Sequence, residues 1–280
     1  MNYTINAEKL NYRKLNLKIR NLLAGPDNNV ASGSNNKSKN CNCSNGTNPS
    51  ITIRNVLGQR YIGDGLEHKN SIKIYGTPGN NLGAFMDGPV IEVYGSGQDG
   101  VGNTMNSGRI IIHGDAGDIL GYSMRGGEIY IKGDIGYRGG INMKSYSGKV
   151  PVIVVGGSAG DFLGEYMAGG IIIVLGLKGK KVLDIPFVGG KRLVGNYVGT
   201  GMHGGKIYIR EELGQCKTGK EVRKMKIDGE DRKILYKYIN NYSNLFDVKD
   251  EKISNGKNSA DNFFKLIPYT HRPYGKLYAY

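Results

Sequence analysis

Glycine recurs every 19 residues in the centre of this 280-residue chain, and this period constrains the fold more than any other feature. Gly76, Gly95, Gly114 and Gly133 each end a short apolar segment. Two β-branched residues stand two and four positions before each glycine: Ile72 and Ile74, Ile91 and Val93, Ile110 and Ile112, and Ile129 and Ile131. A fixed period with alternating apolar residues indicates stacked coils, each of which contributes one strand.

A methionine marks a second position in every coil. The six methionines are Met86, Met105, Met124, Met143, Met167 and Met202, and a glycine stands three residues before each of them. When one residue type recurs at one corner of successive coils, the coils can stack about 4.8 Å apart with equivalent side chains in ladders. We therefore predict an all-β fold, a parallel β-helix of about seven coils over residues 51–211, with the methionines filling its core.

Two insertions interrupt the period. A four-residue insertion around 144–149 is expected before the fifth strand, so that Val152 and Val154 face inward. A longer insertion, 177–192, is expected before the seventh strand, in which Ile207 and Ile209 face inward.

The segments on either side of the repeat differ from it in composition. Residues 1–24 carry apolar residues at helical spacing, which predicts a docking helix that caps the open end of the β-helix. Residues 25–50 are rich in Asn, Ser and Gly and predict a flexible linker. In 212–280 we expect a second helix at 231–246 and then a packed tail, because the tail FFKLIPYTHRPYGKLYAY is apolar and aromatic.

Composition excludes several classes of protein. With 45 Gly but only 8 Pro the chain is not collagen-like. The net charge of +14 is spread along the chain, which argues against a nucleic-acid partner. No apolar run is long enough to cross a bilayer, and no secretory signal is seen at the N-terminus, so we expect a cytoplasmic protein without a membrane partner. Cys41 and Cys43 lack a second pair at ligand spacing, so we predict no metal site there.

No motif in the chain predicts a catalytic, cofactor-binding or metal-binding site. The segment GTGMHG at 199–204 matches a dinucleotide-binding glycine pattern, but it leads into a strand rather than a helix. The four histidines have no nucleophile and carboxylate at recognisable spacing. One Asx residue per coil could form a calcium ladder, but we expect these side chains to bond their own turns: Asn80, Asp99, Asp118, Asp161 and Asn196. We predict no catalytic residue, no cofactor-binding residue and no metal ligand.

An apolar stripe on the outward face of the strands is the candidate partner interface. Its residues are Ile111, Tyr130, Ile153, Ile173 and Tyr208. An outward sheet face that meets water should alternate with polar residues, so the stripe requires a cover. The sequence leaves two candidates for the segment that covers this stripe. One is a partner subunit, and the other is the C-terminal segment of the chain itself, anchored by Phe263, Phe264, Leu266 and Ile267.

The repeat resembles the glycine-rich third domain of the glutamate synthase large subunit. The resemblance covers about 55–211 and rests on VGNTMNSG, GDILGYSMRGGEIYIKG, AGDFLGEYMAGGIIIVLG and YVGTGMHGGKIYIRE. The flanks INAEKLNYRKLNLKIR and FFKLIPYTHRPYGKLY extend it. The resemblance implies a right-handed parallel β-helix that serves as a non-catalytic scaffold subunit of an oxidoreductase of glutamate biosynthesis and nitrogen metabolism. Its partners would be a glutaminase-type amidotransferase subunit and an FMN-binding glutamate synthase subunit. FMN and iron–sulfur clusters would lie on the partners, and none on this chain.

Other functions are compatible with a β-helix, since a fold does not determine a function. A related domain resembles one of the subunits of formylmethanofuran dehydrogenase, and in a complex of that type the partner would be a molybdenum or tungsten protein. A sugar lyase should show a secretion signal and a carboxylate or basic cluster on one strand face, and neither is seen. A hexapeptide-type acyltransferase should show a six-residue period rather than one of 19 residues.

Overall fold

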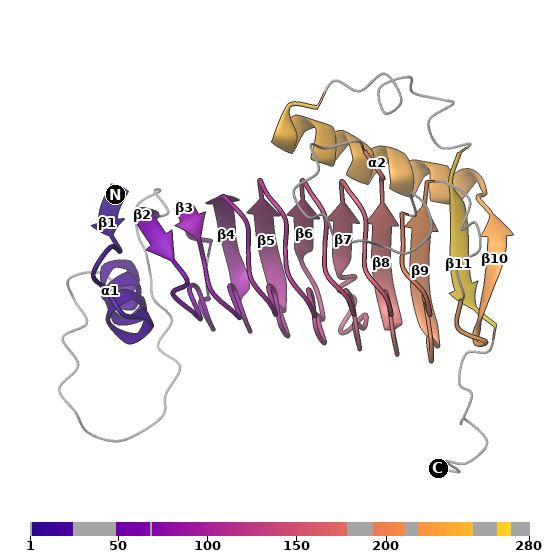
Figure 1. Cartoon of the computed structure of the whole chain (residues 1–280), viewed down its shortest axis with the longest axis horizontal. Coiled ribbons are helices and arrows are strands. Elements are labelled where there is room, and N and C mark those ends of the chain that lie inside the picture. Colours follow the sequence, from indigo (N-terminus) through magenta and orange to yellow (C-terminus); the bar gives the residue numbers. More distant parts are fainter. Residues whose placement is uncertain are drawn as a thin grey trace, which may run out of the picture.

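The computed structural model describes residues 2–24, 49–67, 69–177, 193–210, 218–248 and 262–269. Most of them belong to a long rod of stacked strands with one helix at its N-terminal end and another along one side (Figure 1). In chain order the elements are β1 (Asn2–Asn6), α1 (Tyr12–Ala24), β2 (Ser50–Leu57), β3 (Ser71–Thr77), β4 (Asp87–Tyr94), β5 (Ser107–Ile112), β6 (Glu128–Ile131), β7 (Val152–Val155), β8 (Ala168–Val174), β9 (Gly204–Ile209), β10 (Val222–Lys226), α2 (Gly229–Phe246) and β11 (Phe264–Pro268).

All eleven strands form one sheet in the order β1 to β9, then β11 and β10. From β1 to β9 each strand pairs in parallel with the next. The predicted period is the observed register, since Ile72 pairs with Ile91, Ile91 with Ile110 and Ile110 with Ile129. The predicted parallel β-helix is therefore confirmed.

The core of the rod consists of ladders of equivalent apolar side chains. All six methionines of the repeat are fully buried, as predicted, together with the inward residues of the strands. Because the coils are in register, equivalent side chains lie above one another from coil to coil. Burial of every member excludes water from the length of the rod and stabilises the stack by the hydrophobic effect.

The predicted register of the fifth coil was wrong. Ile153, and not Val152 or Val154, pairs with Ile129 and enters the core, whereas Val152 and Val154 face outward. The insertion adds five residues, since Ile153 follows Ile129 by 24 positions rather than 19. It ends in a tight turn closed by reciprocal backbone hydrogen bonds between Tyr146 and Lys149, at 3.1 and 3.0 Å.

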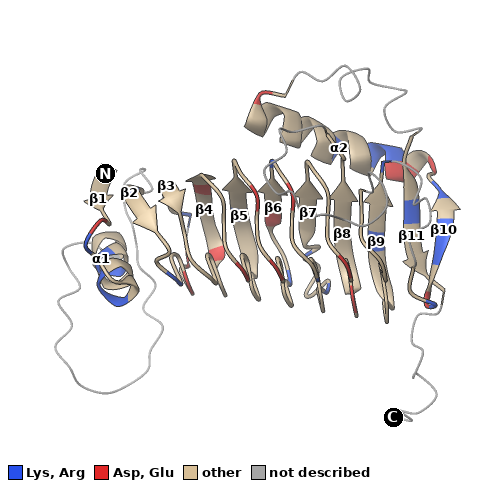
Figure 2. Cartoon of the chain, viewed as in Figure 1, with Lys and Arg blue, Asp and Glu red and all other residues tan. Residues whose placement is uncertain are grey.

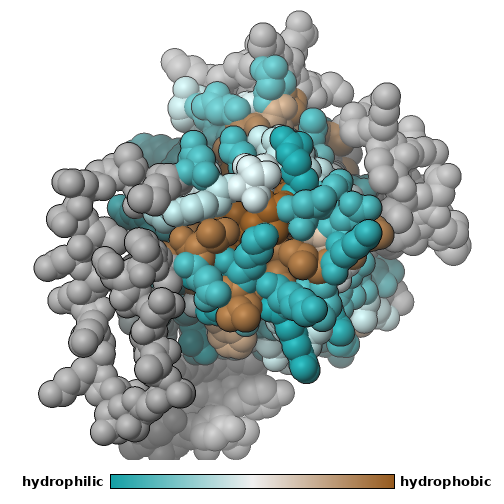
Figure 3. All heavy atoms as spheres, turned by 90° about the vertical axis from the view of Figure 1, so that its left-hand side faces the viewer, coloured by the Kyte–Doolittle hydropathy of each residue, from teal (hydrophilic) through white to brown (hydrophobic). Residues whose placement is uncertain are grey.

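The apolar core of the rod is closed at both ends. Asn11 caps α1 by accepting a hydrogen bond from the Lys14 backbone at 3.0 Å, and Leu15 and Ile19 reach the central core. β1, which was not predicted, adds a strand before β2. Figure 3 looks at this end, where hydrophilic atoms surround smaller apolar areas. At the other end Phe264 of β11 joins the core, so this part of the tail is packed.

Several predicted features lie outside the described residues. They are the linker with Cys41 and Cys43, most of the 177–192 insertion, and the end of the tail beyond 269.

Candidate interaction surfaces

The outward apolar stripe lies under α2. The helix runs along the sheet above the strands from β5 to β9 (Figure 1). Its buried face contributes Leu235, Tyr238, Ile239, Tyr242 and Phe246 to a second apolar cluster, separate from the core of the rod. The two sides of this cluster are far apart in the sequence, and together they bury the stripe that the strand pattern left exposed.

Each residue predicted for a partner interface is buried within the chain. Ile111, Tyr130, Ile173 and Tyr208 pack against α2, and Ile153 is inside the core. The C-terminal segment does supply the cover, but through α2 rather than through the predicted anchors. Of those anchors Phe263 joins the cluster under α2, whereas Phe264 and Leu266 close the end of the core. The stripe is therefore not a free surface.

A buried carboxylate fixes the N-terminal end of α2 to the sheet. Asp231 is fully buried and accepts hydrogen bonds from Lys206 Nζ at 2.9 Å, from the Tyr208 hydroxyl at 2.7 Å and from Lys265 Nζ. It also completes a capping box with Asp228, whose carboxylate meets Lys265 Nζ at 2.8 Å. Figure 2 shows these charges where α2 meets β9 and β11.

The charges of this network perturb one another. Burial tends to raise the pKa of Asp231, but hydrogen bonds from Lys265 and Lys206 outweigh it, and the net pKa lies well below the usual range. Burial opposes the charge of Lys265, yet the hydrogen bonds to Asp228 and Asp231 raise its pKa. Asp231 is therefore ionised at neutral pH, and its role is to hold the helix rather than to transfer a proton.

Side-chain oxygens of one coil accept backbone hydrogen bonds from the next coil. Asp99 accepts from the Asp118 backbone at 3.0 Å, Asp118 from Tyr137 at 3.0 Å, and Asp161 from Asn196 at 2.6 Å. The predicted bonds within their own turns were wrong for these three residues. Because the backbone must advance from coil to coil, an Asx side chain can reach the amide above it and join the two turns.

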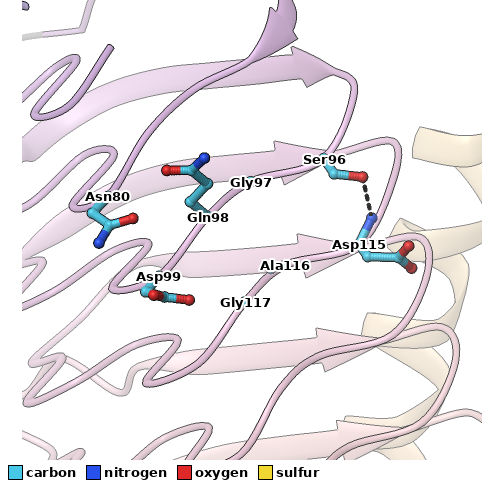
Figure 4. Close-up of a pocket in the computed structure, with 8 residues that line it drawn as sticks. All are labelled: Asn80, Ser96, Gly97, Gln98, Asp99, Asp115, Ala116 and Gly117. Atoms are coloured by element: carbon cyan, nitrogen blue, oxygen red, sulfur yellow. Dashed lines mark hydrogen bonds between the residues drawn. The ribbon is translucent and has the colours of Figure 1, made fainter. Parts of the chain in front are cut away.

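A second ladder of this kind runs beside the first. Ser96 Oγ accepts from the Asp115 backbone at 3.1 Å, Asp115 from Asp134 at 2.8 Å, and Asp134 from Ser158 at 2.6 Å. Between the two ladders is a shallow groove at Asn80, Gln98 and Gly117, and Figure 4 shows Asp99 and Asp115 on its two sides. These carboxylates are engaged in stacking the coils, and no group of three or more potential metal ligands is found among the described residues.

One side of the rod carries exposed aromatic residues. We define the turn face as the six residues before each core methionine, in which exposed or partly exposed residues flank two or three buried ones in the last three coils. Its most exposed rings in the last coils are those of Tyr137, Tyr166 and Tyr197, at 46%, 52% and 42% exposure. Phe162 lies between them and stacks on Tyr197, with ring centroids 5.0 Å apart and planes 16° apart.

Arg138 lies against two of these rings, those of Tyr137 and Phe162. Its guanidinium lies 5.7 Å from the Tyr137 ring centroid and 5.4 Å from that of Phe162. The nearly buried Glu165 pairs with it, with Arg138 Nε 3.2 Å from Glu165 Oε2. We call Tyr137, Arg138, Phe162, Tyr166 and Tyr197 the aromatic row. The ion pair, the stacking of Phe162 on Tyr197 and the packing of the Tyr166 ring over Gly201 hold the row in a defined arrangement at the surface.

Four members of the aromatic row have left-handed backbone conformations. The φ angles of Arg138, Phe162, Tyr166 and Tyr197 are 58°, 60°, 52° and 61°. This region costs a residue with a Cβ roughly 1–2 kcal/mol, and a bulky side chain there is uncommon. Ring stacking returns only about 0.5–1.5 kcal/mol per pair. At the equivalent positions of other coils the chain uses Asn81 and Asn142, which tolerate this conformation more easily, but also the bulky residues Tyr61, Phe85 and Ile119.

A second aromatic stack lies on the sheet beside the end of α2. Tyr75 stacks on Tyr94 at 4.7 Å, Tyr94 on His113 at 4.6 Å, and the edge of Phe246 meets His113. Burial and a hydrogen bond with Glu92 raise the pKa of Tyr94 to about 12. This stack ends against the helix, so it extends the packing of α2 over the earlier coils.

Among the described residues, no helix has both the length and the apolar content to cross a membrane. The family model described as GXGXG motif matches residues 22–269. An uncharacterized protein of Methanocaldococcus jannaschii is 42% identical over 276 residues, which cover 98% of this chain and 95% of that relative.

Proposed function

This chain belongs to the GXGXG motif family and is a glutamate synthase-like domain, and on that premise we propose that it is the non-catalytic scaffold subunit of a glutamate synthase-type oxidoreductase. In such a complex it assembles a glutaminase-type amidotransferase subunit with a synthase subunit that carries FMN and iron–sulfur clusters. The partners then convert glutamine and 2-oxoglutarate into glutamate, and this chain holds them in place so that ammonia passes between them.

The observation that carries the proposal is the family match, which extends over nearly the whole sequence. The relative from M. jannaschii matches along almost its full length, which supports a free-standing form of the domain. The structure adds physical support. The acidic ladders are used to stack coils, Asp231 is used to hold α2, and a rigid rod with a defined aromatic row remains to contact other subunits.

Reconstitution tests the proposal. The full chain is mixed with separately purified glutaminase-type and FMN-binding subunits, and the mass of the complex and glutamine-dependent glutamate formation are measured. We expect a ternary complex whose activity depends on this chain, while the chain alone binds no FMN and has neither glutaminase nor synthase activity. A stoichiometrically flavinylated preparation of the isolated chain, or full activity without it, would contradict a non-catalytic scaffold.

Purification from the native source provides a separate test. A molybdenum or tungsten protein that co-purifies in stoichiometric amount would favour the formylmethanofuran dehydrogenase-type complex instead. Metal analysis of the purified complex separates these two outcomes.

A further inference from the structure

The left-handed backbone belongs to the corners of the coils, since Tyr61, Phe85 and Ile119 have it as well, so it does not by itself distinguish the aromatic row. What distinguishes the row is that Tyr137, Tyr166 and Tyr197 of three successive coils are each about half exposed, and Tyr166 is the most exposed of them. Asn142 occupies the equivalent position one coil earlier, directly before Met143. Neighbouring aromatic rings that stay in water on successive coils indicate a surface in contact with another molecule.

The charges on this surface exclude nucleic acids and anionic lipids as partners, although the net charge of the chain is positive. In the last three coils the turn face comprises 137–142, 161–166 and 196–201, with one cation, Arg138, and two carboxylates, Asp161 and Glu165. Glu165 neutralises Arg138, and Asp161 is engaged by the Asn196 backbone. Nucleic acids and anionic lipids require uncompensated cations, so neither fits here.

The composition fits the centre of a protein interface. Such centres are depleted of charge and enriched in Tyr, Phe and Arg. Three rings of about 200 Å² each, roughly half exposed, offer on the order of 300 Å², and the less exposed ring of Phe162 adds to this. A specific interface buries about 800 Å² on each partner, so the row can form its core, with polar residues of the turn face as its rim.

We propose that the aromatic row is the docking site for an uncharged, apolar surface of a partner protein subunit. The inference rests on the proposed function, since it names the side of the rod that one of the two partner subunits occupies. Phe162 and Tyr197 are already stacked, and Arg138 is held by Glu165, so docking orders few side chains. The tyrosine hydroxyls can hydrogen-bond at the edge of the contact.

The test uses the variants Tyr166→Asn and Tyr197→Asn in the full chain, because asparagine occupies equivalent left-handed positions in other coils. Binding to each purified partner subunit is measured by interferometry, and thermal unfolding is recorded in parallel. For one of the two subunits we expect about 30-fold weaker binding per variant. We also expect an unchanged or higher melting temperature. Tyr236→Asn, on the exposed face of α2 with 59% exposure, is the matched control and should change neither quantity.

Each other outcome overturns the inference in a recognisable way. If the wild-type chain binds both subunits and the variants bind them equally well, the partners dock elsewhere, and the proposed function stands. If the variants melt lower and bind normally, the rings serve the stacking of the coils. If the wild type self-associates and the variants do not, the occupant is a second copy of the chain. If the folded wild type binds neither subunit, the proposed function itself fails, and the docking site with it.

Discussion

The hydroxyl of Tyr242 occupies the space that a Cβ atom at Gly156 would take. From there it donates a hydrogen bond to the carbonyl oxygen of Lys132 at 2.9 Å. Gly156 interrupts an outward ladder in which every earlier coil has a larger residue, including Tyr94 and His113. The missing side chain admits the helix to the sheet, so this glycine is required by packing.

Gly156→Ala should therefore destabilise the chain by roughly 1–3 kcal/mol, because the methyl group overlaps the Tyr242 hydroxyl and the Lys132 carbonyl. Urea unfolding measures the cost. In a Tyr242→Phe background the same substitution should cost less, since one of the two overlapping groups is gone. Gly229→Ala, where a Cβ meets nothing within 4 Å, is the control. Equal costs in both backgrounds would show that Tyr242 does not impose the glycine.

Asp231→Asn should cost about 3–5 kcal/mol of unfolding free energy, because it leaves Lys265 nearly buried with only Asp228 to compensate its charge. The neighbouring Glu230→Gln, at an exposed position of the same helical turn, should change stability by less than about 0.5 kcal/mol. Chemical denaturation of both variants makes the comparison. Similar midpoints for the two would mean that α2 is held by its apolar face alone.

The same carboxylate makes stability depend on pH. The pKa of Asp231 is lower in the folded protein than in the unfolded chain, where it lies near 3.9. The unfolded state therefore binds more protons in the acid range, and stability falls as the pH drops below about 4. Asp231→Asn should flatten this part of the profile, which is followed as the urea midpoint from pH 6 to pH 3. A wild-type slope retained in the variant would assign the acid sensitivity to other groups.

Ile129→Asp should prevent stable folding, because an unpaired carboxylate in the fully buried ladder costs several kcal/mol. Lys132→Asp, at an exposed outward position of the same coil, should cost roughly 0.5 kcal/mol or less. Circular dichroism and thermal unfolding distinguish the two. Equal melting temperatures would contradict the register of β6.

Asp115→Ala should cost about 1–3 kcal/mol, since it leaves the Asp134 amide in the stack without its acceptor. Asp115→Asn keeps an acceptor oxygen at that place and should recover most of the loss. Thermal unfolding of the pair tests whether the carboxylate acts through this hydrogen bond. A loss of equal size in both variants would instead show that its charge is needed.

The repeat was predictable because the same pattern of residue types recurs in every coil. The methionines and the strand glycines indicate the same period, so the parallel stacking and the core could be predicted from the sequence. The register of β7 did not, because Gly156 and Gly157 stand together and either could mark the end of the strand. In the structure Gly157 is the glycine equivalent to Gly133, because its amide donates a hydrogen bond to the Gly133 carbonyl oxygen at 2.9 Å.

The apolar stripe and the second helix were each predicted, but their contact was not. Tyr242 and Lys132 are 110 residues apart, and a local sequence pattern does not predict which distant segments come into contact. The interruption of the outward ladder at Gly156 was the available signal. The aromatic row was missed for another reason. Its rings occur at different offsets within the coil, and only the structure shows that Arg138 lies against the rings of Tyr137 and Phe162 from adjacent coils.

The strand at the C-terminal end of the sheet affects whether the protein forms fibres at high concentration. β10 ends the sheet, and Arg223, Lys224 and Lys226 give it three cations within five residues. An open strand edge can template the addition of further chains, and like charges on such an edge oppose it. Two rods that approach through β10 would repel one another, so this end resists growth into fibres.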